Sequence, residues 1–247
     1  MMENDVKTKR TAFRQFMEKN KKCNQAFKII KECLAQEFPN DKDNNMKGKQ
    51  SFVEMIDHKT NMVDDTQLKA SDEIVIESYN PAWPKFARAE INAIKLVCEK
   101  LPFESIHHIG STAVPGLSSK PIIDIFIVIE NITNASKWVK QLSAMGYVDW
   151  PANPDKTHVR LFKGMPPFGS KRTHHIHIID KNNDILEQRL LFRYLLREHK
   201  NIKHDYEALK TTLSKTSKND REAYTNEKLT FIKNTLRANG YTKEISR

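Results

Sequence analysis

The sequence predicts an α+β fold, in which a small mixed β-sheet is flanked by helices and preceded by a helical extension. Two observations lead to this prediction. Short runs rich in Ile, Val and His, at 105–109, 122–129 and 173–179, have the length and composition of strands. Between and after them lie longer segments in which apolar residues recur every three or four positions, as in amphipathic helices. With 247 residues, the chain has room for one large domain and an extension.

The first 72 residues are expected to form a helix and a linker. From residue 8 to residue 37, apolar residues such as Phe13, Phe16 and Ile30 recur at helical spacing. Pro39 ends that pattern, and residues 39–72 are rich in Asn, Asp and Lys, which is typical of a linker with at most a short helix. We therefore divide the chain into a helical extension (1–38), a polar linker (39–72) and a compact domain (73–247).

Capping and turn residues define the elements of the compact domain. A short strand is expected at 74–76, and Pro84 opens a helix that continues to residue 100. Gly146 provides a C-cap for a helix over 135–145, and Asp220 an N-cap for the last helix, which ends at Asn239. The remaining elements are strands at 105–109, 122–129, 159–162 and 173–179, a Gly/Pro turn over 163–171, and helices over 184–200 and from 205 onward.

Composition limits the classes of protein that fit. No apolar run approaches the roughly 20 residues that a membrane span needs, and the N-terminal residues lack the apolar core of a signal peptide. Three scattered cysteines are typical of a reducing compartment, so we expect a cytoplasmic protein. The net charge of +10 arises mainly after residue 72 and suits either an anionic ligand such as a nucleotide or simply solubility. Nucleic acid is not an expected partner, because aromatic and basic residues do not alternate as they do on base-stacking surfaces.

Asp124 is the main candidate functional residue. It is the one charged residue of the otherwise apolar strand Ile122 to Ile129, and such strands usually lie in the middle of a sheet. A buried charge costs several kcal/mol, roughly, unless it is paired, protonated or bound to a metal. The preceding strand ends at Gly110 and Ser111, in a turn whose backbone amides can approach a phosphate. Phosphoryl transfer uses both kinds of group, although an Asp that caps backbone amides beside a tight loop would give the same pattern.

Imidazoles form the second candidate group. In the strand at 173–179, His175 and His177 point to one face and His174 to the other. Two imidazoles at this spacing can bind one metal ion, bracket a phosphate, or act as acid and base. Ordinary hydrogen bonds within a half-buried strand are the alternative explanation.

Basic residues near these groups are candidates for phosphate binding. Lys120 ends the Gly-Ser loop, and Arg172 precedes the His-bearing strand. Arg193 shares one stripe of the helix over 184–200 with Arg189 and Arg197. Such a stripe is usually a solvated face. If it covers the sheet instead, its guanidinium groups match phosphate or carboxylate geometry.

Several motifs, in order along the chain, resemble one known family. They are YNPAWPKFARAE (79–90), HIGSTAVPGLSSKPIIDI (108–125), RTHHIHI (172–178), LLFRYLLREH (190–199) and NDREAYTNEK (219–228). Together they are similar to the GrpB-like family, which is grouped with the nucleotidyltransferase superfamily of the DNA polymerase beta kind. The resemblance covers about residues 74–238, and residues 1–72 have no counterpart in it.

The resemblance implies a nucleotidyltransferase-like fold whose active face lies at the Gly-Ser turn. It implies that Gly110, Ser111 and Thr112 hold a triphosphate and that Asp124 binds a divalent metal ion, Mg²⁺ or Mn²⁺. In that superfamily a second carboxylate stands two positions after the first, but this chain has Phe126 there. Either the imidazoles of the later strand complete a modified metal site, or the fold has kept binding and lost transfer.

Three functions are consistent with the sequence. The first is metal-dependent binding of a nucleoside triphosphate and nucleotidyl transfer to a small-molecule or protein acceptor. In that function Asp124, His175 and His177 are metal ligands or catalytic groups, and the basic residues offset the phosphate charge. The second is a module that binds a nucleotide or coenzyme A without catalysis. The third is an interaction protein that uses its N-terminal helix.

Overall fold

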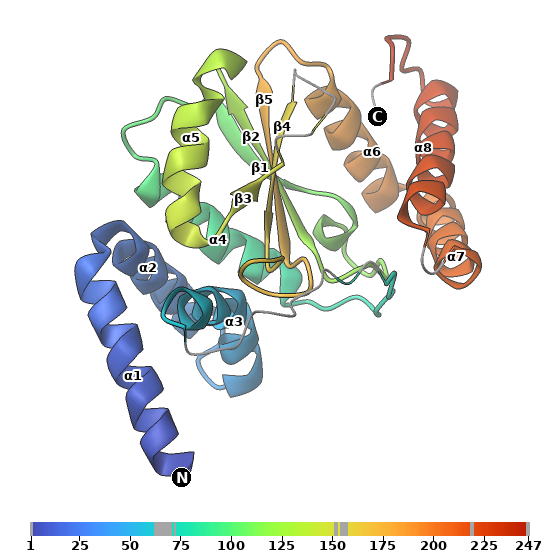
Figure 1. Ribbon diagram of the computed structural model, residues 1–247. Helices are drawn as coiled ribbons and strands as arrows, with labels where there is room; N and C mark the ends of the chain where they lie inside the picture. Colours follow the sequence, from blue (N-terminus) through green and yellow to red (C-terminus); the bar gives the residue numbers. More distant parts are fainter. Residues whose placement is uncertain are drawn as a thin grey trace.

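The computed structural model describes residues 2–61, 71, 73–150, 153, 158–217 and 220–245 of the chain. Within these residues, a five-stranded sheet with the order β1-β2-β5-β4-β3 lies at the centre, with helices on both of its faces (Figure 1). The predicted α+β fold with a small mixed sheet is confirmed. The strands are β1 (Ser105–Ile109), β2 (Ile123–Ile129), β3 (Val148–Asp149), β4 (His158–Lys163) and β5 (His174–Asp180).

The register of the central strands places polar side chains next to one another. β2 and β5 are parallel, and β1, β4 and β3 extend the sheet by antiparallel pairing. Across β2 and β5, Asp124 is opposite His175 and Phe126 is opposite His177. On the other side of β5, Arg160 of β4 is opposite His177. Because side chains alternate along a strand, these five residues lie on one face of the sheet.

The helices are divided between the two faces of the sheet (Figure 1). One face is covered by α4 (Trp83–Val97) and α5 (Ala135–Leu142), and beyond them lie α1 (Met2–Lys19), α2 (Lys21–Glu37) and α3 (Lys42–Lys59). On the opposite side, α6 (Ile185–Glu198) is followed by α7 (Lys200–Thr216) and α8 (Arg221–Ala238). Short 3-10 helices occupy Ser111–Ala113, Ile132–Asn134 and Ser143–Met145.

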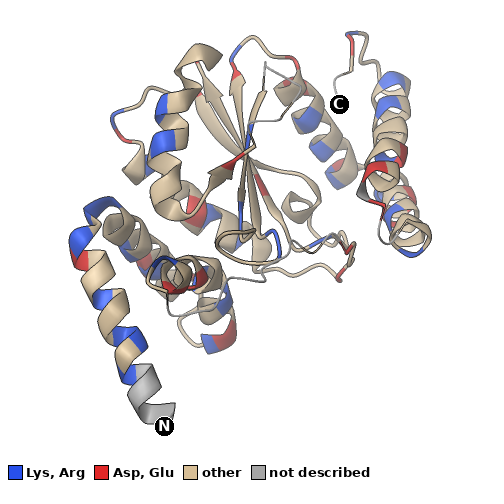
Figure 2. Ribbon diagram, in the orientation of Figure 1, with Lys and Arg blue, Asp and Glu red and all other residues tan. Residues whose placement is uncertain are grey.

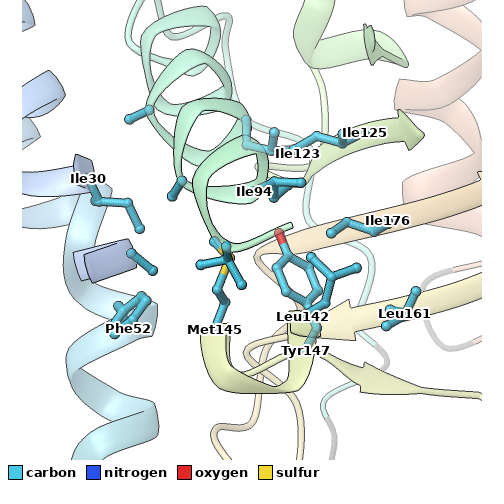
Figure 3. Packing of buried hydrophobic residues seen from close by; sticks show 14 of the residues in the cluster. Ile30, Phe52, Ile94, Ile123, Ile125, Leu142, Met145, Tyr147, Leu161 and Ile176 are labelled. Carbon is cyan, nitrogen blue, oxygen red and sulfur yellow. The ribbon is translucent and has the colours of Figure 1, made fainter. Parts of the chain in front are cut away.

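The face towards α4 holds the main hydrophobic core. Ile125 and Ile176 of the sheet are 0% exposed, and the same cluster includes Ile94 of α4 and Ile30 of α2 (Figure 3). A large apolar side chain contributes about 1.5–3 kcal/mol when it is fully buried. This face therefore anchors the sheet, and the opposite face is left free to carry polar groups.

The N-terminal region differs from the sequence prediction in two ways. The helix expected over 8–37 is two helices, α1 and α2, which are separated at Asn20. The linker expected over 39–72 is wrong for residues 42–59, which form α3. Phe52, Met55 and Ile56 of α3 are 0% exposed and belong to the main core, so α3 is part of the folded unit. Residues 62–70 and 72 of that predicted linker lie outside the described residues.

The compact domain follows the prediction except at β3, which was not expected, at α7, which begins at Lys200 rather than at 205, and at the first predicted strand. The strand expected at 74–76 is not formed; an isolated bridge joins Glu77 to Ser119 instead. Asp220 caps α8 by accepting a hydrogen bond from the Ala223 amide, and Gly146 ends the helical segment in the left-handed conformation, as expected. Within the described ranges, no helix combines the length and the apolarity that crossing a bilayer requires.

Candidate functional site

A cavity of about 1350 Å³ lies on the face of the sheet opposite the main core. Its walls come from β2, β4 and β5, from the turn after β1, and from helices α6, α7 and α8. The candidate residues from three separate parts of the sequence meet there. Those that line the cavity are Gly110, Ser111, Lys120, Asp124, Arg172, His175, His177 and Arg193.

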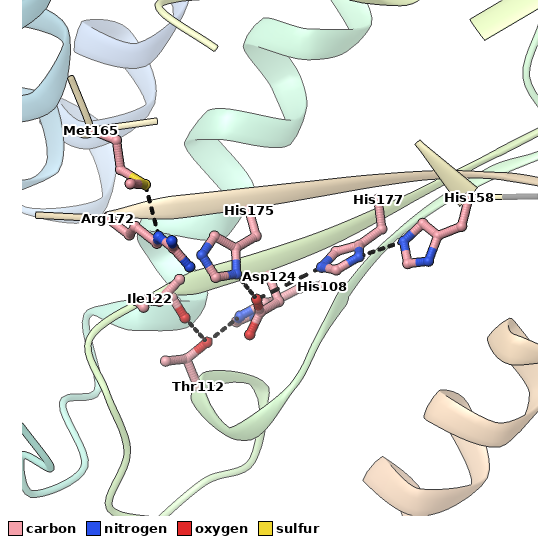
Figure 4. Close-up of polar contacts among 9 residues, drawn as sticks. All are labelled: His108, Thr112, Ile122, Asp124, His158, Met165, Arg172, His175 and His177. Carbon is pink, nitrogen blue, oxygen red and sulfur yellow. Dashed lines mark hydrogen bonds and ion pairs between the residues drawn. The ribbon is translucent and has the colours of Figure 1, made fainter. Parts of the chain in front are cut away.

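Asp124, His175 and His177 form a compact cluster in this cavity (Figure 4). Nδ1 of His175 is 3.0 Å from Oδ1 of Asp124, and Nε2 of His177 is 4.0 Å from the same oxygen. One possible ligand atom from each residue lies within 4.8 Å of the others. Nε2 of His175 is buried and has no hydrogen-bond partner among the described residues. Because such an atom is costly to leave unpaired, its environment suits a ligand that the protein does not itself provide.

The protonation states of the cluster follow from burial and from its neighbours. Burial alone would raise the pKa of Asp124, but the hydrogen bond with His175 and the nearby positive charges, including Lys120, lower it on balance. Burial lowers the pKa of His175, with Asp124 opposing the shift. Burial and the neighbouring imidazoles and arginines hold the pKa of His177 well below its usual value. A charged carboxylate and two neutral imidazoles are the states in which these groups bind metal ions.

His177 is fixed in orientation by two neighbours. Its Nδ1 lies 2.7 Å from Nε2 of His158, which is on the adjacent strand β4. Its ring stacks on Phe126, with 4.7 Å between the ring centroids and 13° between the planes. Because Nδ1 is occupied by His158, Nε2 is the nitrogen that faces Asp124 (Figure 4). Phe126, at the position where the superfamily resemblance implies a second carboxylate, thus supports an imidazole.

The turn after β1 depends on Gly110. Its φ is +75°, and a Cβ at this position would lie 2.5 Å from Oδ2 of Asp124. Thr112 is 1% exposed, and its hydroxyl donates to the Ile122 carbonyl at 3.0 Å. Because that hydroxyl has a single proton, it accepts from Nε2 of His108, also at 3.0 Å. Thr112 therefore ties the turn to the start of β2, and its side chain points away from the cavity into the protein.

The arginine stripe of α6 lies against the turn, with Arg189 and Arg193 partly buried and Arg197 exposed to solvent. Arg193 donates to the backbone carbonyl of His108, and Arg197 donates to that of Ala113. Arg189 lines the cavity one turn earlier. Figure 2 shows these basic positions recurring along α6.

Arg172 is held by apolar neighbours at the other end of the cluster. Its Nε lies 2.7 Å from Sδ of Met165, and its guanidinium is 4.7 Å from the centroid of the Phe162 ring. Its charge contributes to the lowered pKa of His175. Figure 4 shows Arg172, His175 and His177 in sequence along the sheet.

The cavity also contains residues that the predicted site omits, among them His158, Tyr206, Lys210 and Lys228. Lys120 and Lys228 both lie over the ring of Tyr224, at 4.9 Å and 4.4 Å from its centroid. Lys210 is 2% exposed and lies 4.9 Å from the Tyr206 ring centroid. The sequence signal for His158 was its two-residue spacing from Arg160, which places both on the cavity face. Lys210 carried no signal, because its place depends on how α7 packs.

Comparison with known proteins assigns the family. The family model described as "GrpB protein" matches residues 73–238. The chain belongs to the GrpB family. Its matched region contains the turn, the Asp124 cluster and all three helices that close the cavity.

Related proteins confirm this assignment. UPF0157 protein PA4798 of Pseudomonas aeruginosa is 41% identical over 157 residues, and UPF0157 protein YqkA of Bacillus subtilis is 36% identical over 165 residues. These matches cover 64% and 67% of this chain, and the chain spans 64% and 46% of the two relatives' own lengths.

Two solved structures are also similar to part of this chain. The crystal structure of the conserved protein GrpB from Enterococcus faecalis is 30% identical, with a TM-score of 0.59, over 67% of this chain and 99% of that one. A structure of Cid1, described as having RNA terminal uridylyl transferase activity, gives a TM-score of 0.43 and 16% identity over 56% of this chain and 42% of that one. The Enterococcus faecalis match supports the fold described above over the part of the chain that it covers.

Proposed function

We propose that this protein binds a nucleoside triphosphate together with a divalent metal ion and transfers a nucleotidyl group to an acceptor. One observation carries the proposal. A carboxylate and two neutral imidazoles come within 4.8 Å of one another in a basic cavity, beside a glycine turn that is open to phosphate. Metal-assisted phosphoryl transfer uses a bound cation and positive charge around the phosphates, and these residues can supply both.

The donor set fits a divalent cation and discriminates between metals. The buried Nε2 of His175 has no partner among the described residues, and His177 is oriented through His158 as metal-binding imidazoles commonly are. Mg²⁺ prefers oxygen ligands, whereas imidazole suits transition metals. Of the two ions that the sequence suggests, the site therefore favours Mn²⁺. Such an ion, when bound, would neutralise charge that develops on the phosphates.

The protein's own residues would position the reactants. The backbone at Gly110 and Ser111 would approach the triphosphate, since the glycine leaves no side chain in the way. Lys120, Arg172 and Arg193, which line the cavity, would offset its charge. Thr112 would act indirectly, by fixing the turn to β2.

In the transfer, an acceptor hydroxyl oxygen forms a bond to the α-phosphorus of the triphosphate. The bond from that phosphorus to the bridging oxygen of the β-phosphate breaks, and pyrophosphate leaves with the electron pair. The hydroxyl proton passes to a base in the cavity, and His175 or His177, whichever is free of the metal, has a neutral ring nitrogen for it.

The test combines binding and turnover. ATP is titrated by calorimetry with and without Mn²⁺ into the wild type, Asp124→Ala and Asp205→Ala, the last an exposed control on α7. Release of pyrophosphate is then measured with candidate acceptors. We expect Asp124→Ala to weaken Mn²⁺-dependent binding by about tenfold or more, as losses around metal sites do, and the control to behave as wild type. Equal binding by all three proteins would contradict the proposal.

A non-catalytic nucleotide- or coenzyme A-binding module is the second candidate. Phe126 favours it, because this residue is 1% exposed, is stacked on His177 and stands where a second carboxylate is implied. Mn²⁺-dependent affinity for nucleotide, without pyrophosphate release for any acceptor, would support this module over the transferase.

A further inference from the structure

The cavity around the Asp124 cluster has an aromatic end to which the proposed function assigns no role. Trp150 and Phe162 line the cavity there. Trp150 is 39% exposed, whereas the other two tryptophans, Trp83 and Trp138, are 3% and 1% exposed. Aromatic side chains are largely buried on average, so an exposed indole that lines a cavity is a candidate contact for a ligand.

The other aromatic rings of the cavity offer little surface to a ligand. Lys120 and Lys228 already lie over the ring of Tyr224, at 4.9 Å and 4.4 Å from its centroid. In the described ranges, the accessible Phe, Tyr and Trp surface of the cavity therefore belongs to Trp150 and to the half-buried Phe162. The remaining rings are at most 6% exposed, and they are those of Phe126, Phe192, Tyr206 and Tyr224.

The register of the sheet sets the order in which a ligand would meet these groups. Asp124 of β2 is opposite His175 of β5, and His175 is opposite Phe162 of β4. Trp150 directly follows β3, and its backbone amide donates to the Arg160 carbonyl at 3.0 Å, which places it beyond β4. Since neighbouring strands lie about 4.8 Å apart, Phe162 is roughly 10 Å from Asp124 across the sheet. The order across the sheet is the Gly-Ser turn, the metal cluster and then the two aromatic rings.

Ring contacts connect the metal cluster to Trp150. The centroid of the Phe162 ring is 5.0 Å from that of His175 and 6.3 Å from that of Trp150. The guanidinium of Arg160 lies over the Trp150 ring, 5.9 Å from its centroid. An aromatic ring has two faces, so a guanidinium over one face holds the indole in place and leaves the other face for a flat ligand.

A nucleoside triphosphate carries its groups in the matching order. Its outer phosphates stand at one end, the α-phosphate follows, and the ribose and base form the other end. If the α-phosphate lies at the cluster and the outer phosphates point towards Gly110 and Lys120, the base extends towards Phe162 and Trp150. Aromatic side chains bind bases of any kind in this way, because every base has a flat π-face.

We propose that Trp150 stacks on the base of the bound nucleotide and thereby orients its triphosphate towards the Gly-Ser turn. This inference rests on the proposed nucleotide binding, since it names the residue that recognises the base. Phe162 fills the space between the stacked base and His175, and Arg160 holds the indole from its other face.

Calorimetry with the full chain tests this role of Trp150. In the presence of Mn²⁺, the protein is titrated with an ATP analogue whose α,β bridge is a methylene group, which prevents turnover. It is titrated separately with inorganic tripolyphosphate, which has no base. The variants are Trp150→Ala, Trp150→Phe and, as a control, Tyr194→Ala. Tyr194 is 56% exposed on α6 and does not line this cavity. A melting curve of each variant confirms that it is folded.

We expect Trp150→Ala to bind the analogue at least about fivefold more weakly than the wild type, as the loss of one base–aromatic stack does. Its affinity for tripolyphosphate should change by about twofold or less, because stacking involves only the base. Trp150→Phe should keep most of the wild-type affinity for the analogue, and Tyr194→Ala all of it. Undiminished binding of the analogue by Trp150→Ala, or an equal loss for both ligands, would overturn the proposal.

Fluorescence gives a second measurement, because Trp150 is the exposed one of the three tryptophans. The analogue should change the emission of the wild type, tripolyphosphate should not, and Trp150→Phe should lose the response. A response that persists in Trp150→Phe would place the base elsewhere and overturn the proposal.

The two proposals fail in different ways. If the wild type binds neither ligand, nucleotide binding fails, and the base contact fails with it. If the wild type and Trp150→Ala bind the analogue equally well, only the base contact fails, and nucleotide binding at the cluster stands.

Discussion

Replacement of Gly110 by alanine is the sharpest test of the link between the turn and the metal cluster. The added Cβ would lie 2.5 Å from Oδ2 of Asp124, at a backbone φ of +75°. An L-residue in that conformation costs about 1–2 kcal/mol. To relieve the contact the carboxylate must rotate and give up its 3.0 Å hydrogen bond to His175, which costs about 1.5–3 kcal/mol more. We therefore expect Gly110→Ala to lower the free energy of unfolding by about 3 kcal/mol or more.

Gly240 provides the matched control. Its φ is +85°, and a Cβ there would meet nothing within 4 Å, so Gly240→Ala should lose only the backbone cost of about 1–2 kcal/mol. Urea denaturation measures the free energy of unfolding of both variants. The comparison is valid if the slope of that free energy against urea concentration is unchanged. Mn²⁺ affinity should fall in Gly110→Ala and stay at the wild-type value in Gly240→Ala. Equal losses of stability in the two variants, or an unchanged Mn²⁺ affinity in Gly110→Ala, would refute the reasoning.

Three further predictions concern buried residues. Lys163→Met leaves Glu90 charged and buried without the lysine that lies 2.8 Å from it. Urea denaturation should show that the free energy of unfolding falls by about 3–5 kcal/mol. A fall of less than about 1 kcal/mol would speak against a stabilising ion pair. Phe52→Ala on α3 should lower the free energy of unfolding by about 3–5 kcal/mol, and the variant should still unfold in one cooperative transition. If the N-terminal helices melt separately from the rest, α3 is independent of the sheet. Burial, with Lys228, lowers the pKa of Lys210 to about 7, so this group is largely neutral at pH 8, and a bound anion should raise its pKa and draw in a proton. Calorimetry of ATP binding in two buffers of different ionisation enthalpy measures this proton uptake. Lys210→Gln should abolish the uptake, and equal proton uptake by the wild type and the variant would contradict the prediction.

Local sequence patterns were sufficient for most of the sheet. The strand at 105–109 was predicted with its observed ends, and those at 122–129 and 173–179 within one residue. Asp124 stood out because a single charge in an apolar strand needs a physical reason. The pairing of Asp124 with His175 was beyond the sequence, because it depends on the parallel register of two strands that are 51 positions apart.

The prediction failed where packing overrides composition. Residues 42–59 look like a linker because Asn, Asp and Lys dominate, yet a few apolar side chains on one face suffice to bury α3. The short run at 74–76 has strand composition but forms no ladder. The sequence left open whether the α6 arginines face solvent or cover the sheet, because the loop carbonyls that Arg193 and Arg197 contact come from residues 84 or 85 positions away. Contacts of that range cannot be read from helical spacing.

Anomalous diffraction from crystals soaked with Mn²⁺ and the methylene-bridged ATP analogue tests the central claim most directly. The account predicts one strong manganese peak within bonding distance of Asp124 and of His175 or His177, with the triphosphate density running from it towards Lys120. A manganese peak elsewhere, or nucleotide density outside this cavity, would contradict it.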